Sequence, residues 1–425
     1  MLLAQQDESY NKVIVFCCFL FMAVNIGFTS TGFNVYQTYI VELPGMNHSL
    51  GGVVPTIRAL VSLLATFFVS FYYRRLDCRA GVVLGTSLTA LGFAVYAICP
   101  SFPAFAVGSV FTGLGYGLGG AVATTLLVGR WFKRDVGKAA GFAAMGSGVA
   151  GAVIPVMAAA VIGDFGLQAS FALEAAIAAV IAVFIGLMLR NRPAGRESVT
   201  AGVPKAGSVN DKASDEAPAA AEEEKPYLTR HDHNMLLVAM LGVGCACTGG
   251  VSYLAILMKS NGIEPLLAAS IVAVQGVTLS AGKFCAGAVM DKLGSRRGAV
   301  LFFGIFITAL LLCSAAFTGS IVICVLGAMF FGLGASLGST GISVWSLEFS
   351  HKDDRARIAK DFQAAYALGG LITNLLPGIL MEFTGTYCVS YLFMAFMVAL
   401  SLAIILRVYR HRAHQKVEHP GRVLF

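Results

Sequence analysis

The sequence predicts an all-α integral membrane protein with twelve transmembrane helices in two bundles of six. Of its 425 residues, 57% are hydrophobic and only 12% are charged, whereas about a quarter of a soluble globular chain is charged. Lipid is therefore the expected solvent for most of the surface. Apolar runs of about 20 residues, the length that crosses a bilayer, also recur along the whole chain.

Each predicted span is an apolar run bounded by charged or turn residues. The first run starts near Val13 and has no charge before Glu42, which is too long for the apolar region of a cleavable signal peptide. The spans of the first half are 13–36, 50–73, 80–99, 103–128, 139–162 and 167–189, and those of the second half are 234–258, 266–290, 298–317, 320–347, 362–381 and 387–406.

A segment of different composition separates the two sets of spans. Residues 191–232 contain four prolines, alanine-rich stretches and three consecutive glutamates, which is typical of a solvated linker. We therefore predict a six-helix bundle over 1–190, a cytoplasmic linker over 191–232 and a second bundle over 233–425 that ends in a short tail. A regulatory docking role for the linker is the alternative.

The distribution of lysine and arginine predicts the orientation. With the N-terminus inside, 27 of the 30 Lys and Arg residues fall on inner segments, and the outer loops hold only Lys259. We therefore expect a plasma (inner) membrane protein with both termini in the cytoplasm. The same distribution accounts for the net charge of +7 without a nucleic-acid partner.

Between spans eight and nine the sequence reads Gly287-Ala-Val-Met-Asp291-Lys292-Leu-Gly294-Ser-Arg296-Arg297. This motif resembles the loop signature of the major facilitator superfamily, G-x-x-x-D-[RK]-x-G-x-[RK]-[RK]. In this family, two six-helix halves enclose a substrate site at the bilayer midplane. We expect Gly287 to allow close helix approach, Gly294 to permit the turn, and Asp291 to pair with a basic group or a helix N-terminus across an inner gate.

The first half departs from this motif between spans two and three. Arg74 stands where the acidic residue belongs, and Asp77 stands where the second glycine belongs. The basic residues Arg74 and Arg75 remain, so the first-half gate lacks its acidic member unless Asp77 replaces it.

Spans four and five contain a glycine-rich fourth span, an R-W-F-x-x-R-x-G-type loop and a G-x-G fifth span, in this order. The segments are Gly113-Leu-Gly115-Tyr-Gly117-Leu-Gly119-Gly120, Gly129-Arg130-Trp131-Phe132-Lys133-Arg134-Asp-Val-Gly137 and Gly146-Ser-Gly148. This stretch resembles the monocarboxylate and oxalate–formate antiporter groups of the superfamily. Small residues at such spacing let helices pack closely, and generic packing is the alternative explanation for each glycine.

Two cations lie inside predicted spans, and such residues are costly in lipid and often mark function. Arg58 lies about seven residues from the outer end of span two, and Lys283 about seven residues from the inner end of span eight, so each is roughly 10 Å deep. In the oxalate–formate group, a basic residue four positions before the loop motif engages the substrate carboxylate, and Lys283 holds that position. The alternatives are a snorkelling Lys283 and a structurally paired Arg58.

Span eleven supplies neutral polar residues to the predicted substrate site. The resemblance implies a second lysine there in oxalate-selective members, but this span offers only Gln363, Tyr366 and Asn374. This difference argues against oxalate itself as the substrate.

Acidic residues are scarce near the hydrocarbon. Glu174 lies near the outer end of span six, and Asp361 lies at the inner end of span eleven. We interpret Glu174 as structural, because the sixth span of this fold is usually peripheral. Two cations in the spans without matching anions describe a site for a small anion.

The leading hypothesis is therefore a secondary transporter, expected to be monomeric, that moves a small mono- or dicarboxylate by alternating access. It would act as an exchanger or a proton-linked carrier, with protons as the candidate coupling ion and no cofactor. A multidrug or neutral-solute efflux carrier is the alternative, although the acidic residue that this class ordinarily has in its first spans is missing. A membrane enzyme or receptor has little support, because no nucleophile–base pair or metal cluster is evident, and the ten cysteines form no CxxC pair.

Overall fold

The computed structural model describes residues 2–132, 136–190, 228–350 and 355–418. In this part of the chain, 12 helical stretches are long and apolar enough to cross a membrane. Each coincides with one predicted span, with limits that differ by a few residues. The all-α, twelve-span prediction is therefore confirmed. Most of the predicted linker, as far as residue 227, lies outside the described residues.

The helices of the first half follow one another with short connections. Spans one and four are each divided, span one by a π-helical segment and span four at Gly120. In chain order the elements are α1 (Leu2–Met22), η1 (Ala23–Gly32), α2 (Phe33–Ile40), α3 (His48–Arg75), α4 (Cys78–Ile98), α5 (Phe102–Gly119), α6 (Ala121–Trp131), α7 (Val136–Phe165) and α8 (Leu167–Met188).

The second half is interrupted at the corresponding places, in spans seven and ten. The elements are α9 (Arg230–Gly244), η2 (Cys245–Gly249), α10 (Gly250–Ser252), α11 (Leu254–Ser260), α12 (Pro265–Leu293), α13 (Ser295–Ser314), η3 (Ala315–Thr318), α14 (Ile321–Ala335), η4 (Ser336–Gly338), α15 (Thr340–Glu348), α16 (Arg355–Thr384) and α17 (Cys388–Glu418). Irregular backbone at membrane depth is tolerated only where protein or a water-filled cavity surrounds it. These interruptions therefore draw attention to spans one, four, seven and ten.

Two compact units are distinguished by their internal contacts. Unit 1 consists of Met1–Pro204, Val251–Val277 and Asn374–Thr386, and unit 2 consists of Lys205–Gly250, Thr278–Thr373 and Tyr387–Phe425. Short pieces of the second half of the sequence therefore pack with the first half.

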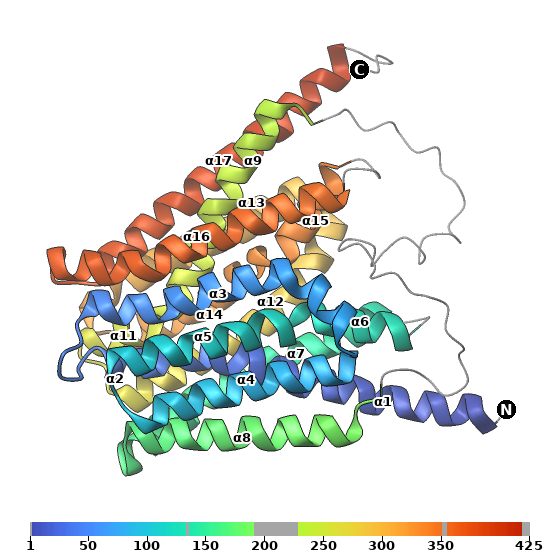
Figure 1. The fold of residues 1–425 in the computed structure, drawn as a ribbon. Coiled ribbons are helices and arrows are strands. Elements are labelled where there is room, and N and C mark those ends of the chain that lie inside the picture. The colour runs from blue at the N-terminus through green and yellow to red at the C-terminus, as the bar shows by residue number, and fades with distance from the viewer. Residues whose placement is uncertain (1, 133–135, 191–227, 351–354, 419–425) are drawn as a thin grey trace. The chain divides into compact units, whose positions relative to one another are not determined.

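Unit 1 is organised around α4 and η1. The helix α4 packs along both α5 and α8, and α3 packs along the other side of α5 (Figure 1). The segment η1 lies against α7, while α2 contacts α11. An aromatic cluster of Phe33, Tyr36, Phe93, Tyr96, Phe105 and Phe171 fills the space between α2, α4, α5 and α8.

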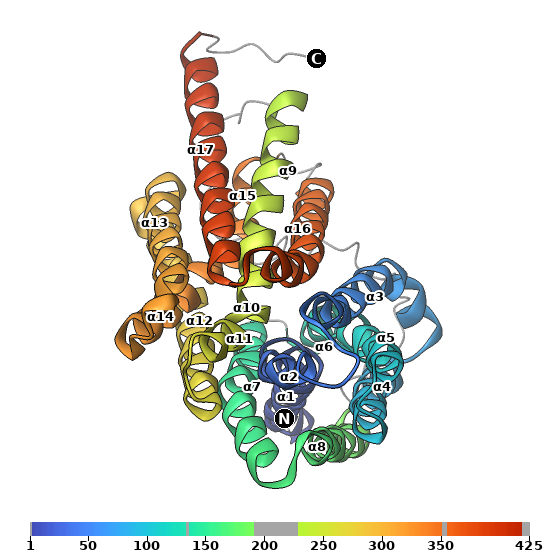
Figure 2. The ribbon, with the colours of Figure 1, turned by 90° about the vertical axis from the view of Figure 1, so that its left-hand side faces the viewer.

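In unit 2, four helices pack side by side in the order α9, α17, α13 and α14. The helix α17 lies beside α9 on one side and α13 on the other, and α13 also packs along α14 (Figure 2). Eight of the ten cysteines in the chain are buried, whereas Cys99 and Cys285 are exposed.

Candidate functional site

Arg58 is a buried cation of α3 in unit 1. Its side chain is 7% exposed, its Nη1 donates to the carbonyl oxygen of Thr29 in η1, and its guanidinium lies 5.4 Å from the centre of the Phe33 ring. A guanidinium has five N–H donors, and no carboxylate of the described residues pairs with it. Arg58 therefore retains donors for an anionic partner.

The glycine run of span four positions α5 against α3 and α4. A Cβ atom at Gly113 would lie 2.7 Å from the carbonyl oxygen of Arg58, and one at Gly117 would lie 2.7 Å from that of Ser62. A Cβ at Gly115 would lie 2.7 Å from the carbonyl oxygen of Gly85 on α4. Alternate glycines therefore serve two different interfaces, which explains the G-x-G-x-G spacing by close packing.

Sequence reasoning missed a buried asparagine in η1. Asn25 Nδ2 donates to the carbonyl oxygen of Gly119 at 2.8 Å and to Thr86 Oγ1 at 3.1 Å. Its Oδ1 accepts from Thr89 Oγ1 at 2.7 Å. The amide thus fixes span one to spans three and four, and its polarity inside an apolar run was the only signal in the sequence.

Lys283 is a half-buried cation of α12 in unit 2. Thr340 Oγ1 donates to its backbone carbonyl oxygen at 3.2 Å. Its ammonium group makes no hydrogen bond or ion pair with the described residues. The three donors of this ammonium therefore remain for a ligand.

The interrupted part of span ten connects Lys283 with Tyr366. The Tyr366 hydroxyl lies beside Gly338, where an added Cβ would meet it at 2.7 Å. Thr340, two residues further, makes the hydrogen bond to the Lys283 backbone. The residues 338–340 therefore contact both α16 and α12 within unit 2.

The other two polar residues of α16 have different environments. Asn374 is fully buried, and its Oδ1 accepts from Ser252 Oγ at 3.1 Å, while Nδ2 has no partner among the described residues. Its backbone carbonyl oxygen accepts from the Tyr253 hydroxyl at 2.7 Å. Gln363 is exposed.

The predicted gating motif lies at the junction of α12 and α13. Gly294 adopts φ +80°, as the predicted turn requires. Gly287 differs from the expectation, because a Cβ there would meet only Thr340 Cγ2 at 3.7 Å, which is ordinary contact and does not require glycine. Lys292, Arg296 and Arg297 are exposed, and the side chain of Asp291 lies outside the described residues.

The first-half counterpart lies at the end of α3. Arg74 and Arg75 are exposed in its last turn, and Arg75 lies 5.4 Å from the centre of the Phe71 ring. A groove of about 400 Å³ between α3 and α5 reaches Arg75. Its remaining walls are almost entirely apolar, so it does not suit a small anion. They are formed by Val61, Leu64, Ala65, Phe68, Phe71, Tyr72, Leu76, Leu114 and Leu118.

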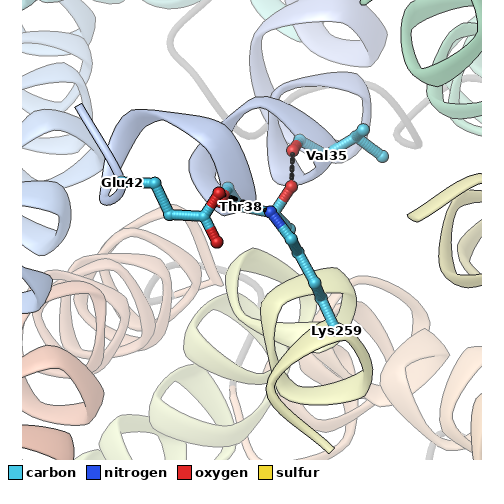
Figure 3. A network of polar contacts seen from close by, with 4 residues as sticks. All are labelled: Val35, Thr38, Glu42 and Lys259. Atoms are coloured by element: carbon cyan, nitrogen blue, oxygen red, sulfur yellow. Dashed lines mark hydrogen bonds and ion pairs between the residues drawn. The ribbon is translucent and has the colours of Figure 1, made fainter. Parts of the chain in front are cut away.

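A polar network joins α2 to α11 within unit 1 (Figure 3). Lys259 Nζ lies 2.7 Å from Glu42 Oε2 and donates to the carbonyl oxygen of Thr38 at 3.3 Å. It also lies 4.7 Å from the centre of the Tyr39 ring. One turn earlier, Asn34 Oδ1 accepts from the Ala255 backbone N–H at 3.1 Å. The sequence singled out Lys259 only as the one basic residue of an outer loop.

The comparisons with known proteins agree with this architecture. A family model of the Major Facilitator Superfamily matches residues 15–257 and 235–423. The chain therefore belongs to the major facilitator superfamily and is a multi-pass membrane transporter of that class.

Individual proteins of known sequence are similar to this chain at low identity. Monocarboxylate transporter 12 of Mus musculus is 22% identical over 436 residues, which cover 97% of this chain and 89% of that protein. The Rattus norvegicus protein of that name is 22% identical over 419 residues, covering 94% and 85%.

Among solved structures, the nucleoside transporter NupG has a TM-score of 0.72 at 12% identity, covering 93% of this chain and 98% of that chain. A bacterial homologue of the human lysosomal transporter Spinster, in an inward-facing and occupied conformation, has a TM-score of 0.68 at 15% identity, covering 94% and 97%. At sequence identities of 12% and 15%, these structural similarities show a shared fold.

Proposed function

We propose that this transporter moves a small organic anion, a mono- or dicarboxylate, by alternating access. One observation carries the proposal. The two cations inside the spans, Arg58 and Lys283, have no acidic partner among the described residues. A cation removed from water is costly unless it is paired, so both positions favour a ligand that brings negative charge.

The chemistry of the two cations suits a carboxylate. Charge-assisted hydrogen bonds from ammonium or guanidinium groups to a carboxylate are shorter and about twice as strong as neutral ones. Lys283 offers all three of its donors, while Arg58 spends one on Thr29 and is held in place by the Phe33 ring. We propose Lys283 as the primary contact and Arg58 as a second cationic contact of the transported anion.

The neutral residues of α16 would then define the rest of the substrate. The unpaired Nδ2 of Asn374 is a donor for a carbonyl or hydroxyl oxygen, and we propose the same role for the hydroxyl of Tyr366. Gln363 is exposed one turn before Tyr366, and we propose it as a contact on the path of the substrate. The 22% identity to monocarboxylate transporter 12 supports a monocarboxylate over other anions.

A neutral solute is the second candidate, and the buried Asn374 favours it. An asparagine with a fully buried, unpaired donor recognises neutral polar groups as well as anions. Lys283 distinguishes the two candidates, because a neutral solute would leave its ammonium without a counter-charge.

Counterflow into proteoliposomes tests the proposal. The panel comprises radiolabelled formate, acetate, lactate, pyruvate, oxalate and succinate, with uridine and a cationic dye as competing classes. Lys283→Gln should abolish anion counterflow and Arg58→Gln should weaken it strongly, since truncating one partner of a buried charge pair costs about 2–5 kcal/mol. Lys283→Arg should retain part of the activity.

Lys360→Gln is the matched control, because Lys360 is an exposed lysine of α16 and its removal should leave counterflow unchanged. Normal anion counterflow in Lys283→Gln, or counterflow of uridine or the dye alone in the parent protein, would reject the anion proposal.

We further propose that the protein is a monomer in a plasma or inner membrane with both termini in the cytoplasm. The strong bias of lysine and arginine toward one set of loops supports the orientation of the termini. Exchange and proton-linked transport are both compatible with the proposed site.

A further inference from the structure

A second ionisable site lies in unit 1, where α2 meets α8. Glu174 on α8 is fully buried, and its Oε1 accepts a hydrogen bond of 2.6 Å from the Tyr36 hydroxyl on α2. Oε2 has no partner among the described residues. The Tyr36 hydroxyl also lies 2.7 Å from Ser170 Oγ, one turn before Glu174.

Among the residues that the structure describes, no cation pairs with this carboxyl group. Of the ionisable groups around α2, α4 and α8, Tyr36 bonds Glu174 directly, whereas Tyr96 bonds Ser109 and Thr112 instead. Arg58 is directed to Thr29 and Phe33, and Asp164 at the end of α7 is exposed.

The surroundings favour the neutral form of this carboxyl group. The ring of Phe171 stacks on Tyr36 with centres 4.2 Å apart, so the side that faces Tyr36 is aromatic. A buried carboxylate with one hydrogen bond and no counter-charge is strongly unfavourable. Glu174 is therefore expected to carry a proton while α2 lies against α8.

The helix α2 connects this carboxyl group to α11. One face of α2 presents Tyr36 to α8, while Asn34 and Thr38 contact α11. The same short helix is thus held by Glu174 on one side and by the Lys259 network on the other. A movement of α2 away from α8 would expose the carboxyl group to water and allow it to ionise.

We propose that Glu174 is the proton-binding residue of the transport cycle. Its carboxylate accepts a proton from a hydronium ion on one side of the membrane, leaving water, and remains neutral while it is bonded to Tyr36. When α2 separates from α8, the carboxyl group returns the proton to water. This inference rests on the proposed anion transport, to which it adds the coupling ion.

Infrared difference spectroscopy of the purified protein tests the protonation directly and needs no substrate. A carbonyl stretch of a protonated carboxyl group should be present at neutral pH, absent in Glu174→Gln and shifted in Tyr36→Phe. It should also disappear reversibly at alkaline pH. The matched control Asp164→Asn removes an exposed acid and should leave the band unchanged. An identical band in Glu174→Gln, or one that does not respond to pH, would overturn the proposal.

Transport separates this proposal from that of the anion site. With the panel anion that gives the fastest counterflow, an inward proton gradient should accelerate uptake by the parent protein and by Asp164→Asn. Glu174→Gln should keep counterflow, which needs no proton release, but lose the gradient stimulation. Stimulation that persists in Glu174→Gln, or that is absent in the parent protein, would overturn the proton site and leave the anion site standing.

If the parent protein transports no panel anion, the anion proposal fails, and the infrared titration alone decides on Glu174.

Discussion

The substitution Lys259→Met should loosen the contact between α2 and α11 by a predictable amount. The Lys259–Glu42 pair is close, but the side chains are 21% and 61% exposed, so solvent screening limits it to about 0–1 kcal/mol. The Tyr39 ring adds about 0.5–1 kcal/mol through its cation–π contact. A total of about 0.5–2 kcal/mol corresponds to a change of about 2–30-fold in an equilibrium between closed and open contacts.

Thiol labelling from outside measures this change. Thr38 is 3% exposed, so a cysteine introduced by Thr38→Cys should react only when α2 separates from α11. The background requires Cys99→Ser and Cys285→Ser, since the remaining native cysteines are buried. We expect Lys259→Met to raise the labelling rate several-fold at low salt and by less at high ionic strength, where exposed charges are screened.

Two further variants make this prediction refutable. Lys259→Arg retains the charge and the cation–π contact, so it should label at nearly the parent rate. A double-mutant cycle with Glu42→Gln should give a coupling of at most about 1 kcal/mol. Unchanged labelling in Lys259→Met, or an equal rise in Lys259→Arg, would show that these contacts do not hold α2 against α11.

The other predictions concern orientation, gating and packing. A reporter fused after Phe425 should read cytoplasmic, and a cysteine replacing Asn47 should be labelled from outside; the opposite result would reverse the predicted topology. Asp291→Asn should slow transport more than it weakens substrate binding, and Arg74→Ala should have a smaller effect, whereas equal and mild effects would mean that the motif does not govern the conformational step. Gly115→Ala should lower thermal stability by about 1–3 kcal/mol through overpacking, because its Cβ would crowd Gly85 and Thr89; an unchanged melting temperature would contradict this packing account.

The number and positions of the spans could be predicted because a helix in lipid must satisfy its backbone internally and be apolar along its length. Span three, for example, was predicted over 80–99 and is found at Cys78–Ile98. The turn at Gly294 was predictable for a similarly local reason, since its motif requires a backbone conformation that glycine adopts most easily.

The contacts within the bundle could not be predicted, because they depend on residues far apart in the sequence. Tyr36 and Glu174 are 138 positions apart, and Lys259 and Glu42 are 217 positions apart. The sequence analysis interpreted Glu174 as structural, because the sixth span of this fold is usually peripheral. The structure places it against a tyrosine and pairs it with no cation of the described residues, and this arrangement is the basis for proposing a proton site. The π-helical segments in spans one and seven are also invisible to hydropathy, because they change the hydrogen-bond pattern without changing the apolar composition.

Span one joins the features of unit 1 that the proposals use. Its η1 segment supplies the Thr29 carbonyl oxygen that holds Arg58, and its α2 segment supplies Tyr36 to Glu174. The backbone carbonyl oxygen of Thr38, also in α2, accepts a hydrogen bond from Lys259 Nζ. A physical basis for coupling two sites is an element with two arrangements whose equilibrium both sites bias. A single displacement of α2 would alter its contacts with Arg58, Glu174 and Lys259 together. Binding of an anion at Arg58 and of a proton at Glu174 would then act on one equilibrium, so neither ligand needs to contact the other for their transport to be linked.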